Sequence, residues 1–263
     1  MDPSQERHAP FGSMEIGEGM RFPDQLCRPF IILGMHRSGS SMLSRIVNRS
    51  GVFMGLFQEH NAEALRFLKI NQLLLKEHGA SWIDPLPVEE SRQNFPDDLS
   101  LYREHFKLGI ESALYRRWLH NHPWGWKDPR NTFTLGYWLR RFPKAQLLHI
   151  HRDGRQVAMS LLRRNERSGE VHNPRLNDPV FGLSLWERYM EQMELWRSRG
   201  IQLVDLEYVD LSEARSSVVK KLQRAIGGPV RIDPTGPASF HEIPAELEKA
   251  ALKSPMMNKY GYL

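Results

Sequence analysis

The chain has few of the residues that mark secreted, membrane-spanning or cysteine-ligated proteins. Cys27 is the only cysteine among 263 residues, so neither an internal disulfide nor a cysteine-based metal site is possible. No apolar run reaches the roughly 18–20 residues that a membrane helix needs. The N-terminus has no charged-apolar-small pattern of a secretory signal. These absences favour a cytoplasmic protein without a membrane span.

Positive charge is in modest excess, with 36 Lys and Arg against 31 Asp and Glu. The sequence contains no dense basic block and no internal repeat, so nucleic-acid binding is not indicated. An anionic ligand suits the net charge of +5. Seven Trp and twelve Phe exclude a wholly disordered chain and leave ample material for one core.

Short apolar runs alternate with amphipathic segments from residue 30 onward. This alternation predicts a single α/β domain over 30–263, with a doubly wound, mostly parallel sheet flanked by helices. Residues 1–29 show neither the hydrophobic period of a helix nor that of a strand, and we expect them to be poorly ordered. Within them, Gly12-Ser13-Met14 resembles a cloning junction, which makes the first thirteen residues a candidate tag.

The expected elements follow from hydrophobic period and from capping residues. Asn131 or Thr132 is predicted to cap one helix, and Asp153 another. Long loops are expected over 84–98 and 165–182, and after residue 228 the tail is expected to be irregular until the last apolar residues. The expected strands span residues 29–34, 124–127, 145–151 and 201–207. One helix is expected to follow the first turn and to end near residue 50, and another is expected to follow Asp153. The remaining helices are expected to span about 62–78, 102–118, 131–142, 183–198 and 212–227.

The turn Gly34 to Ser41 joins the first strand to the first helix, as a phosphate-binding P-loop does. Its glycines permit a tight turn, and the free N–H groups of a helix start attract an anion. Arg37 adds a guanidinium, and hydroxyl donors are available from Ser38, Ser40 and Ser41.

The lysine of nucleotide-triphosphate P-loops is missing from this turn. It should follow Gly39, where Ser40 stands. Without it, phosphoryl transfer loses its contact to the β- and γ-phosphates. A kinase or NTPase stays open as an alternative, as does a plain Gly/Ser turn.

A second cationic cluster leaves the strand at 145–151. Arg152 ends this strand and Ser160 lies eight residues further on, so the two can grip a second phosphate. The His-Arg-Asp run is not a protein-kinase catalytic loop, because residues 151–160 contain no Asn. Arg155 is expected on a solvated helix face.

The two motifs together resemble the sulfotransferases that use 3′-phosphoadenosine 5′-phosphosulfate (PAPS), over roughly residues 30–208. The resemblance implies that Arg37-Ser38-Gly39-Ser40-Ser41 binds the 5′-phosphosulfate, and that Arg152 and Ser160 hold the 3′-phosphate. Trp126-Lys127-Asp128-Pro129-Arg130 is similar to a segment of tyrosylprotein and many bacterial members, in which the lysine, here Lys127, faces the phosphosulfate bridge.

Three departures separate the chain from cytosolic small-molecule sulfotransferases and favour the tyrosylprotein-like and bacterial members. Met42 stands where those enzymes have a tryptophan that stacks on adenine. Their C-terminal Arg-Lys-Gly segment is not visible, and their Lys-Thr-His catalytic histidine is absent. Adenine stacking and the general base must therefore come from other residues.

The activity implied is transfer of a sulfuryl group from PAPS to a hydroxyl or amine acceptor, leaving 3′,5′-adenosine bisphosphate (PAP). Arg37 and Lys127 suit charge neutralisation. Glu59 is the first candidate for the base and His60 the second, although Glu59 also suits a helix N-terminal charge. His36 is a third candidate, expected mainly to fill space or orient the turn. No His/Asp ligand cluster argues for a metal.

The acceptor is the least specified partner. The two long loops, together with Trp124, Trp138 and Trp186, are candidates for its site. A small molecule, a carbohydrate or a peptide fits these features. A non-catalytic nucleotide-binding protein on the same fold is the remaining alternative.

Overall fold

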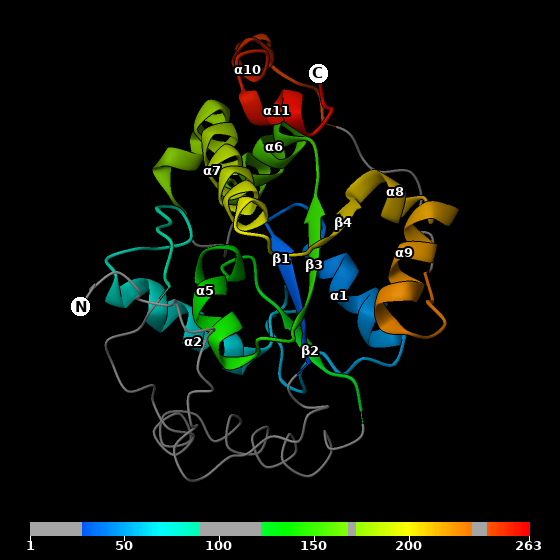
Figure 1. The fold of residues 1–263 in the computed structure, drawn as a ribbon. Coiled ribbons are helices and arrows are strands. Elements are labelled where there is room, and N and C mark those ends of the chain that lie inside the picture. The colour runs from blue at the N-terminus through cyan, green and yellow to red at the C-terminus, as the bar shows by residue number, and fades with distance from the viewer. Residues whose placement is uncertain (1–27, 90–121, 168–171, 233–240) are drawn as a thin grey trace, which may run out of the picture.

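A parallel four-stranded sheet forms the centre of the structure, a computed structural model that describes residues 28–89, 122–167, 172–232 and 241–263. Its strand order is β2-β1-β3-β4, and all three pairings are parallel (Figure 1). The predicted α/β class is thereby confirmed. The strands are β1 (Phe30–Gly34), β2 (Gly125–Lys127), β3 (Gln146–His151) and β4 (Val204–Glu207).

The central strand β1 pairs with β2 on one side and β3 on the other. Ile32 lies opposite Lys127, and Gly34 lies opposite Ile150. Because the strands are parallel, their carboxyl ends meet at one edge of the sheet, where ligands of such folds bind. The pairing is close: a Cβ added at Gly125 would lie 2.1 Å from the Phe30 carbonyl oxygen.

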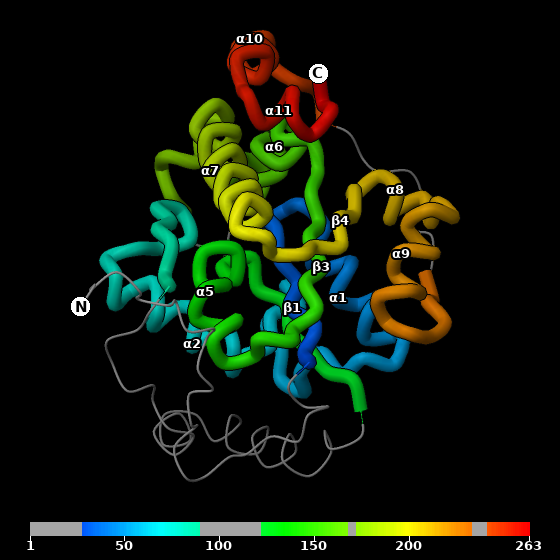
Figure 2. The backbone as a smooth tube through the Cα atoms, viewed as in Figure 1, coloured from blue at the N-terminus to red at the C-terminus, as the bar shows by residue number. Residues whose placement is uncertain are grey.

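Helices cover both faces of the sheet, as the alternation of side chains along β1 shows. Ile31 and Leu33 belong to one buried cluster, and Phe30 and Ile32 belong to the other. Figure 2 shows α1 and α9 on one side and α5 and α7 on the other. The helices are α1 (Ser40–Arg49), α2 (Leu65–Glu77), α5 (Asn131–Arg141), α6 (Gly154–Asn165), α7 (Pro179–Ser198), α8 (Tyr208–Ser212), α9 (Ser216–Ile226), α10 (Ala245–Ala251) and α11 (Pro255–Lys259). In the described residues, no helix has both the length and the apolar character to cross a bilayer.

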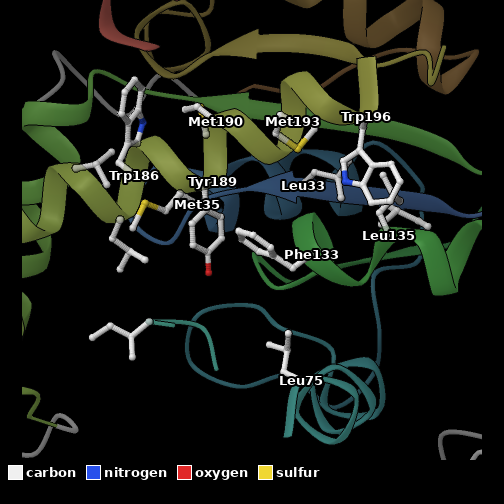
Figure 3. Packing of buried hydrophobic residues seen from close by; sticks show 14 of the residues in the cluster. Leu33, Met35, Leu75, Phe133, Leu135, Trp186, Tyr189, Met190, Met193 and Trp196 are labelled. Atoms are coloured by element: carbon white, nitrogen blue, oxygen red, sulfur yellow. The ribbon is translucent and has the colours of Figure 1, made fainter. Parts of the chain in front are cut away.

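The larger cluster is built around α7. Figure 3 shows Tyr189, Met193 and Trp196 of this helix pointing toward Leu33 of β1 and Phe133 of α5. All five side chains are buried. The packing fixes α7 against the sheet and places α6 beside it.

Tryptophans that we expected near an acceptor are core residues instead. Trp124, Trp138 and Trp186 are 3%, 2% and 0% exposed. Trp126 and Phe67 stack with ring centroids 4.0 Å apart, and Trp138 meets Trp126 edge-on. The surfaces of these rings are buried in core packing, so these tryptophans do not line an acceptor site.

The ends of the α6–α7 connection are more ordered than predicted. A 3₁₀ turn occupies Pro174–Asn177, and α7 begins at Pro179 rather than near residue 183. The side chain of Asp178 caps α7 by accepting from the Val180 N–H. The predicted loop over 165–182 is therefore wrong over at least residues 174–182.

Other boundaries differ for local reasons. The helix expected over 212–227 begins later, as α9 at Ser216, and an additional short helix, α8, precedes it; Ala214 at φ 52° lies between the two. The tail from residue 241 onward is not irregular, since it forms α10 and α11. Asp153 caps α6 as predicted, whereas neither Asn131 nor Thr132 caps α5, because both lie inside that helix. The expectations for residues 1–27, most of 84–98 and the helix at 102–118 lie outside the described residues.

A buried amide joins α2 to α5 and to the end of β2. The Asn71 side chain donates to Asp128 Oδ2 at 2.9 Å and accepts from Thr134 Oγ1 and Trp138 Nε1. Asn71 is fully buried, so each of these partners depends on it for hydrogen bonding.

We expect Asn71→Ala to lower the free energy of unfolding by about 3 kcal/mol or more, because several buried polar groups lose their partner. Gln72→Ala, at the exposed neighbouring position, is the matched control and should change it by less than about 0.5 kcal/mol. Urea denaturation measures both. Equal effects of the two substitutions would contradict the role of Asn71.

Candidate active site

The turn after β1 adopts a backbone that forms anion sites. Arg37 and Gly39 have φ values of 69° and 98°, in the left-handed region. Such residues let consecutive N–H groups converge on one ligand. Ser38 closes the turn through its hydroxyl, which donates to the Met35 carbonyl at 2.7 Å. A Cβ at Gly39 would meet the Tyr208 ring at 2.4 Å, so only glycine fits here.

A hydrogen bond joins the two predicted phosphate motifs. Arg37 Nε donates to Ser160 Oγ at 3.0 Å, across 123 residues of sequence. Ser160 lies on α6, which leaves the carboxyl end of β3 through Arg152 and Asp153. The structure thus brings both motifs to one edge of the sheet.

Arg152 is buried against an aromatic ring. It is 8% exposed, and its guanidinium carbon lies 4.4 Å from the centre of the Tyr208 ring. Burial lowers the pKa of Arg152 from its usual value, while Tyr208 and Asp153 act in the opposite direction. A cation so placed gains stability from an anionic partner.

Tyr208 was not singled out by the sequence motifs, although it contacts both of them. It starts α8 directly after β4, and its ring lies close to both Gly39 and Arg152. The available signal was positional: Tyr208 follows the carboxyl end of a parallel strand, where doubly wound folds bind ligands.

The C-terminal part of the chain returns to the same edge. Gln156 of α6 exchanges two hydrogen bonds with the backbone of His241, at 3.1 and 2.8 Å. Burial lowers the pKa of the His241 imidazole, and the charges of Arg163, Arg152 and Arg37 lower it further. His241 therefore lies within the field of both motifs, which no sequence signal indicated.

Lys127 ends β2 and is 1% exposed. Its ammonium donates to Glu63 Oε1 and to the Asn61 carbonyl oxygen, both at 2.8 Å. Burial lowers the pKa of Lys127, and the Glu63 carboxylate opposes that shift. The Asn61 oxygen also accepts from Ser41 Oγ at 2.6 Å. Lys127 is thus linked to the first turn through one shared oxygen.

The carboxylate beside Lys127 is Glu63 rather than Glu59. Glu59 and His60 are exposed, whereas Glu63 is 5% exposed. A tight turn separates them: Ala62 has φ 61°, and the Glu59 N–H donates to the Glu63 carbonyl oxygen at 2.9 Å. Glu59 is also not an N-terminal helix charge, because α2 begins only at Leu65.

His36 is buried within the first turn and packs on Trp82, with ring centroids 4.8 Å apart. Burial lowers the pKa of His36 well below its usual value, and the charges of four nearby cations lower it further. Its imidazole is therefore uncharged at neutral pH. Its Nε2 makes no hydrogen bond with any described residue.

Arg155 does not lie on a solvated face as we expected. Its guanidinium pairs with Asp153 and with Glu248 of α10, each at 2.7 Å, and donates to the Tyr262 carbonyl oxygen. These contacts bind the C-terminal helices to the start of α6. The prediction for Arg155 is wrong, because α10 and α11 were not anticipated.

Metal ligands do not gather at this edge. Over the ranges that the structure describes, no group of three or more His, Cys, Asp or Glu side chains is arranged to hold a metal ion. The polar groups that do converge are mainly cations and hydroxyls. Such a set suits an anionic ligand.

Comparison with known proteins identifies the family. The profile of the sulfotransferase family matches residues 29–231, so the chain belongs to the sulfotransferase family. No curated protein matches the sequence.

Solved structures of low sequence identity are similar to this chain, and the first of them shares its fold. The sulfotransferase domain of the Synechococcus PCC 7002 olefin synthase is 15% identical, with 85% of this chain and 80% of that chain covered and a TM-score of 0.51. The sulfotransferase STF1 of Mycobacterium tuberculosis is 15% identical, with 90% and 77% covered and a TM-score of 0.46. The sulfotransferase STF9 of Mycobacterium avium is 18% identical, with 89% and 68% covered and a TM-score of 0.44.

A histidine beside the second motif gives the fold a dependence on pH. His151 ends β3, and its Nδ1 lies 2.7 Å from the Tyr262 hydroxyl. Burial lowers the pKa of His151 to about 3. Because folding lowers the pKa of this histidine, only the unfolded chain binds a proton when the pH falls below the unfolded pKa of about 6.5. The free energy of unfolding is therefore highest above that pH and decreases as the pH falls.

We expect His151→Asn to lose less stability than the unmodified protein between pH 7 and pH 5, by up to about 2 kcal/mol. The substitution removes the proton that the unfolded chain binds in this interval. Urea denaturation at the two pH values measures the difference, with His122→Asn at an exposed position as the control. An unchanged pH dependence in His151→Asn would contradict the assignment.

Proposed function

We propose that this chain transfers a sulfuryl group from PAPS to a hydroxyl or amine of a small molecule, carbohydrate or peptide. Membership of the sulfotransferase family supports the activity. The observation that carries the donor assignment is the Arg37–Ser160 hydrogen bond, because it unites the two phosphate motifs. The single cysteine supports a reducing, cytoplasmic setting, and we assign residues 30–263 to the catalytic domain.

The donor would lie across the carboxyl ends of β1 and β3. In this proposal the turn from Arg37 to Ser41 binds the 5′-phosphosulfate through its N–H groups, with hydroxyls from Ser38, Ser40 and Ser41 available to assist. Arg152 and Ser160 bind the 3′-phosphate. Tyr208, rather than a tryptophan at position 42, supplies the aromatic contact for adenine in this proposal, since its partly exposed ring lies next to Gly39 of the first turn and to Arg152.

The chemical step is an in-line displacement at sulfur. The acceptor oxygen forms a bond to the sulfur atom as the bond from sulfur to the bridging phosphate oxygen breaks, and the electron pair leaves with PAP. Arg37 and Lys127 stabilise the negative charge that develops on that oxygen. The acceptor proton passes to a base, and no metal takes part in this scheme.

We assign the base to Glu63. Its carboxylate is buried and lies 2.8 Å from the ammonium that would face the leaving group. A base must lie within reach of the proton that it removes, and the exposed side chains of Glu59 and His60 are less suited than a buried carboxylate beside Lys127. The uncharged His36 orients the turn in this scheme.

We expect Arg152→Ala to weaken PAP binding by at least about tenfold, because a charge-assisted contact to the 3′-phosphate is lost. Titration calorimetry measures the change, and Arg224→Ala at an exposed position on α9 is the control. The same titration with Mg²⁺-ATP should show no comparable binding. Tight binding of Mg²⁺-ATP but not PAP would favour a kinase or NTPase instead.

We expect Glu63→Gln to reduce kcat by about 10²- to 10⁴-fold while the Kd for PAP changes little, as removal of a general base requires. The measurement is transfer of labelled sulfate from PAPS to a panel of sugars, phenols and peptides. Glu59→Gln tests the assignment: a large loss there with activity retained in Glu63→Gln would return the role to Glu59. PAP binding without transfer to any acceptor would favour a non-catalytic protein.

A further inference from the structure

We infer that Tyr262 positions Arg152 for the 3′-phosphate of the donor, by holding the residues on both sides of it. This inference rests on the proposed function and adds a positioning residue to the same site. Tyr262 follows α11, and Figure 1 shows this part of the chain beside α6, beyond the carboxyl end of β3. Arg152 lies in the short turn that joins β3 to α6.

The first contact of Tyr262 fixes the residue that precedes Arg152. The Tyr262 hydroxyl oxygen lies 2.7 Å from Nδ1 of His151. Burial lowers the pKa of His151 to about 3 and raises the pKa of Tyr262 above its usual value, so both side chains are uncharged at neutral pH. The contact is therefore a hydrogen bond between two neutral groups, and it is lost when the hydroxyl is removed.

The second contact of Tyr262 fixes the residue that follows Arg152. The Tyr262 carbonyl oxygen accepts a hydrogen bond from Arg155 Nη2 at 2.9 Å. The same guanidinium donates to both carboxylate oxygens of Asp153, at distances of 2.7 to 3.2 Å. Asp153 in turn caps α6 by accepting from the Arg155 N–H. Arg152 thus lies between two residues that one tyrosine holds, directly on one side and through Arg155 on the other.

Tyr262 is itself anchored by residues outside this turn. Its main-chain N–H donates to the carbonyl oxygen of Met257, a fully buried residue of α11, at 2.9 Å. Gly261, with φ 74°, lets the chain turn back after that helix. The centre of the Tyr262 ring lies 6.3 Å from that of the buried Trp186 of α7. Because the core holds Tyr262, its hydroxyl and carbonyl oxygen give the turn a fixed support.

Arg152 depends on such support because a guanidinium binds phosphate oxygens in a directed geometry. The Tyr208 ring contacts the guanidinium, whereas His151 and Asp153 fix the main chain from which the side chain extends. A small rotation of that main chain moves the far end of a long side chain most, and a small misplacement weakens a directed contact. Loss of the Tyr262 hydroxyl should therefore be felt at the 3′-phosphate.

The test compares two nucleotides that differ only in the 3′-phosphate. Titration calorimetry gives the Kd for PAP and the Kd for 5′-AMP, and their ratio measures what the 3′-phosphate contributes to binding. We expect Tyr262→Phe to weaken PAP binding by about three- to tenfold, the range for loss of one neutral hydrogen bond, and to change 5′-AMP binding by less than about twofold. The affinity for 5′-AMP also shows that the variant is folded.

Tyr260→Phe is the matched control. Tyr260 lies close by in the chain, but its hydroxyl contacts Glu194 and Arg197 instead of the turn that carries Arg152. This substitution also removes one hydroxyl and keeps the ring, so it should change the stability of the fold without changing the ratio of the two Kd values. An equal change of the ratio in Tyr260→Phe and Tyr262→Phe would overturn the inference.

Arg155→Lys tests the second contact. It retains the charge, but an ammonium cannot join Asp153 to the Tyr262 carbonyl oxygen as the guanidinium does. We expect it to weaken PAP binding more than 5′-AMP binding. It also decides the matter by the same criteria if Tyr262→Phe does not fold.

A double-mutant cycle separates positioning from a general loss of stability. When Arg152→Ala is already present, Tyr262→Phe should not change the Kd ratio further, because the guanidinium that it positions is absent. An effect on the ratio that is the same with and without Arg152 would contradict the inference. Equal weakening of PAP and 5′-AMP binding by Tyr262→Phe would also contradict it.

The unmodified protein separates a failure of this inference from a failure of the proposed function. The proposed function requires that PAP bind more tightly than 5′-AMP and that Arg152→Ala remove this preference. If either result is not obtained, the proposed function fails and this inference fails with it. If both are obtained and Tyr262→Phe leaves the preference unchanged, only this inference is overturned.

Discussion

The central position of β1 determines where the chemical groups of this protein lie. Its parallel pairing with β2 and β3 brings the ends of three strands to one edge. The first turn, Lys127 and Arg152 follow those ends, although they are far apart in sequence. Side-chain contacts then link them, above all the hydrogen bond from Arg37 to Ser160. The sheet thus creates the site, and the motifs only supply its functional groups.

The site contains two buried cations. Lys127 and Arg152 are both nearly inaccessible to solvent, and removing such ions from water costs several kcal/mol each. Glu63 offsets the cost for Lys127, and the face of the Tyr208 ring offsets part of it for Arg152. In the proposed function, the phosphates of the donor would add further negative charge beside these two cations.

Sequence reasoning succeeded where a pattern has one physical interpretation. Apolar runs bounded by turn residues predicted all four strands, and the Gly/Ser turn predicted the link from β1 to α1. It failed where position depends on a distant segment. Glu63 was missed because the left-handed turn at Ala62, not a motif, directs it inward while Glu59 faces solvent. Arg155 was misplaced because its partner Glu248 lies in a short helix with no clear periodic signal, and its partner Tyr262 lies in the tail beyond the last helix.

One oxygen atom has a consequence for the order of events at this site. The Asn61 carbonyl accepts from Ser41 on the first turn and from Lys127 on β2. In the proposed function, a donor phosphate that recruits the Ser41 hydroxyl would leave this oxygen to the Lys127 ammonium alone and would change the ion pair of Lys127 with Glu63. With Glu63 as the proposed base, this coupling would favour compulsory-order kinetics in which the nucleotide enters first.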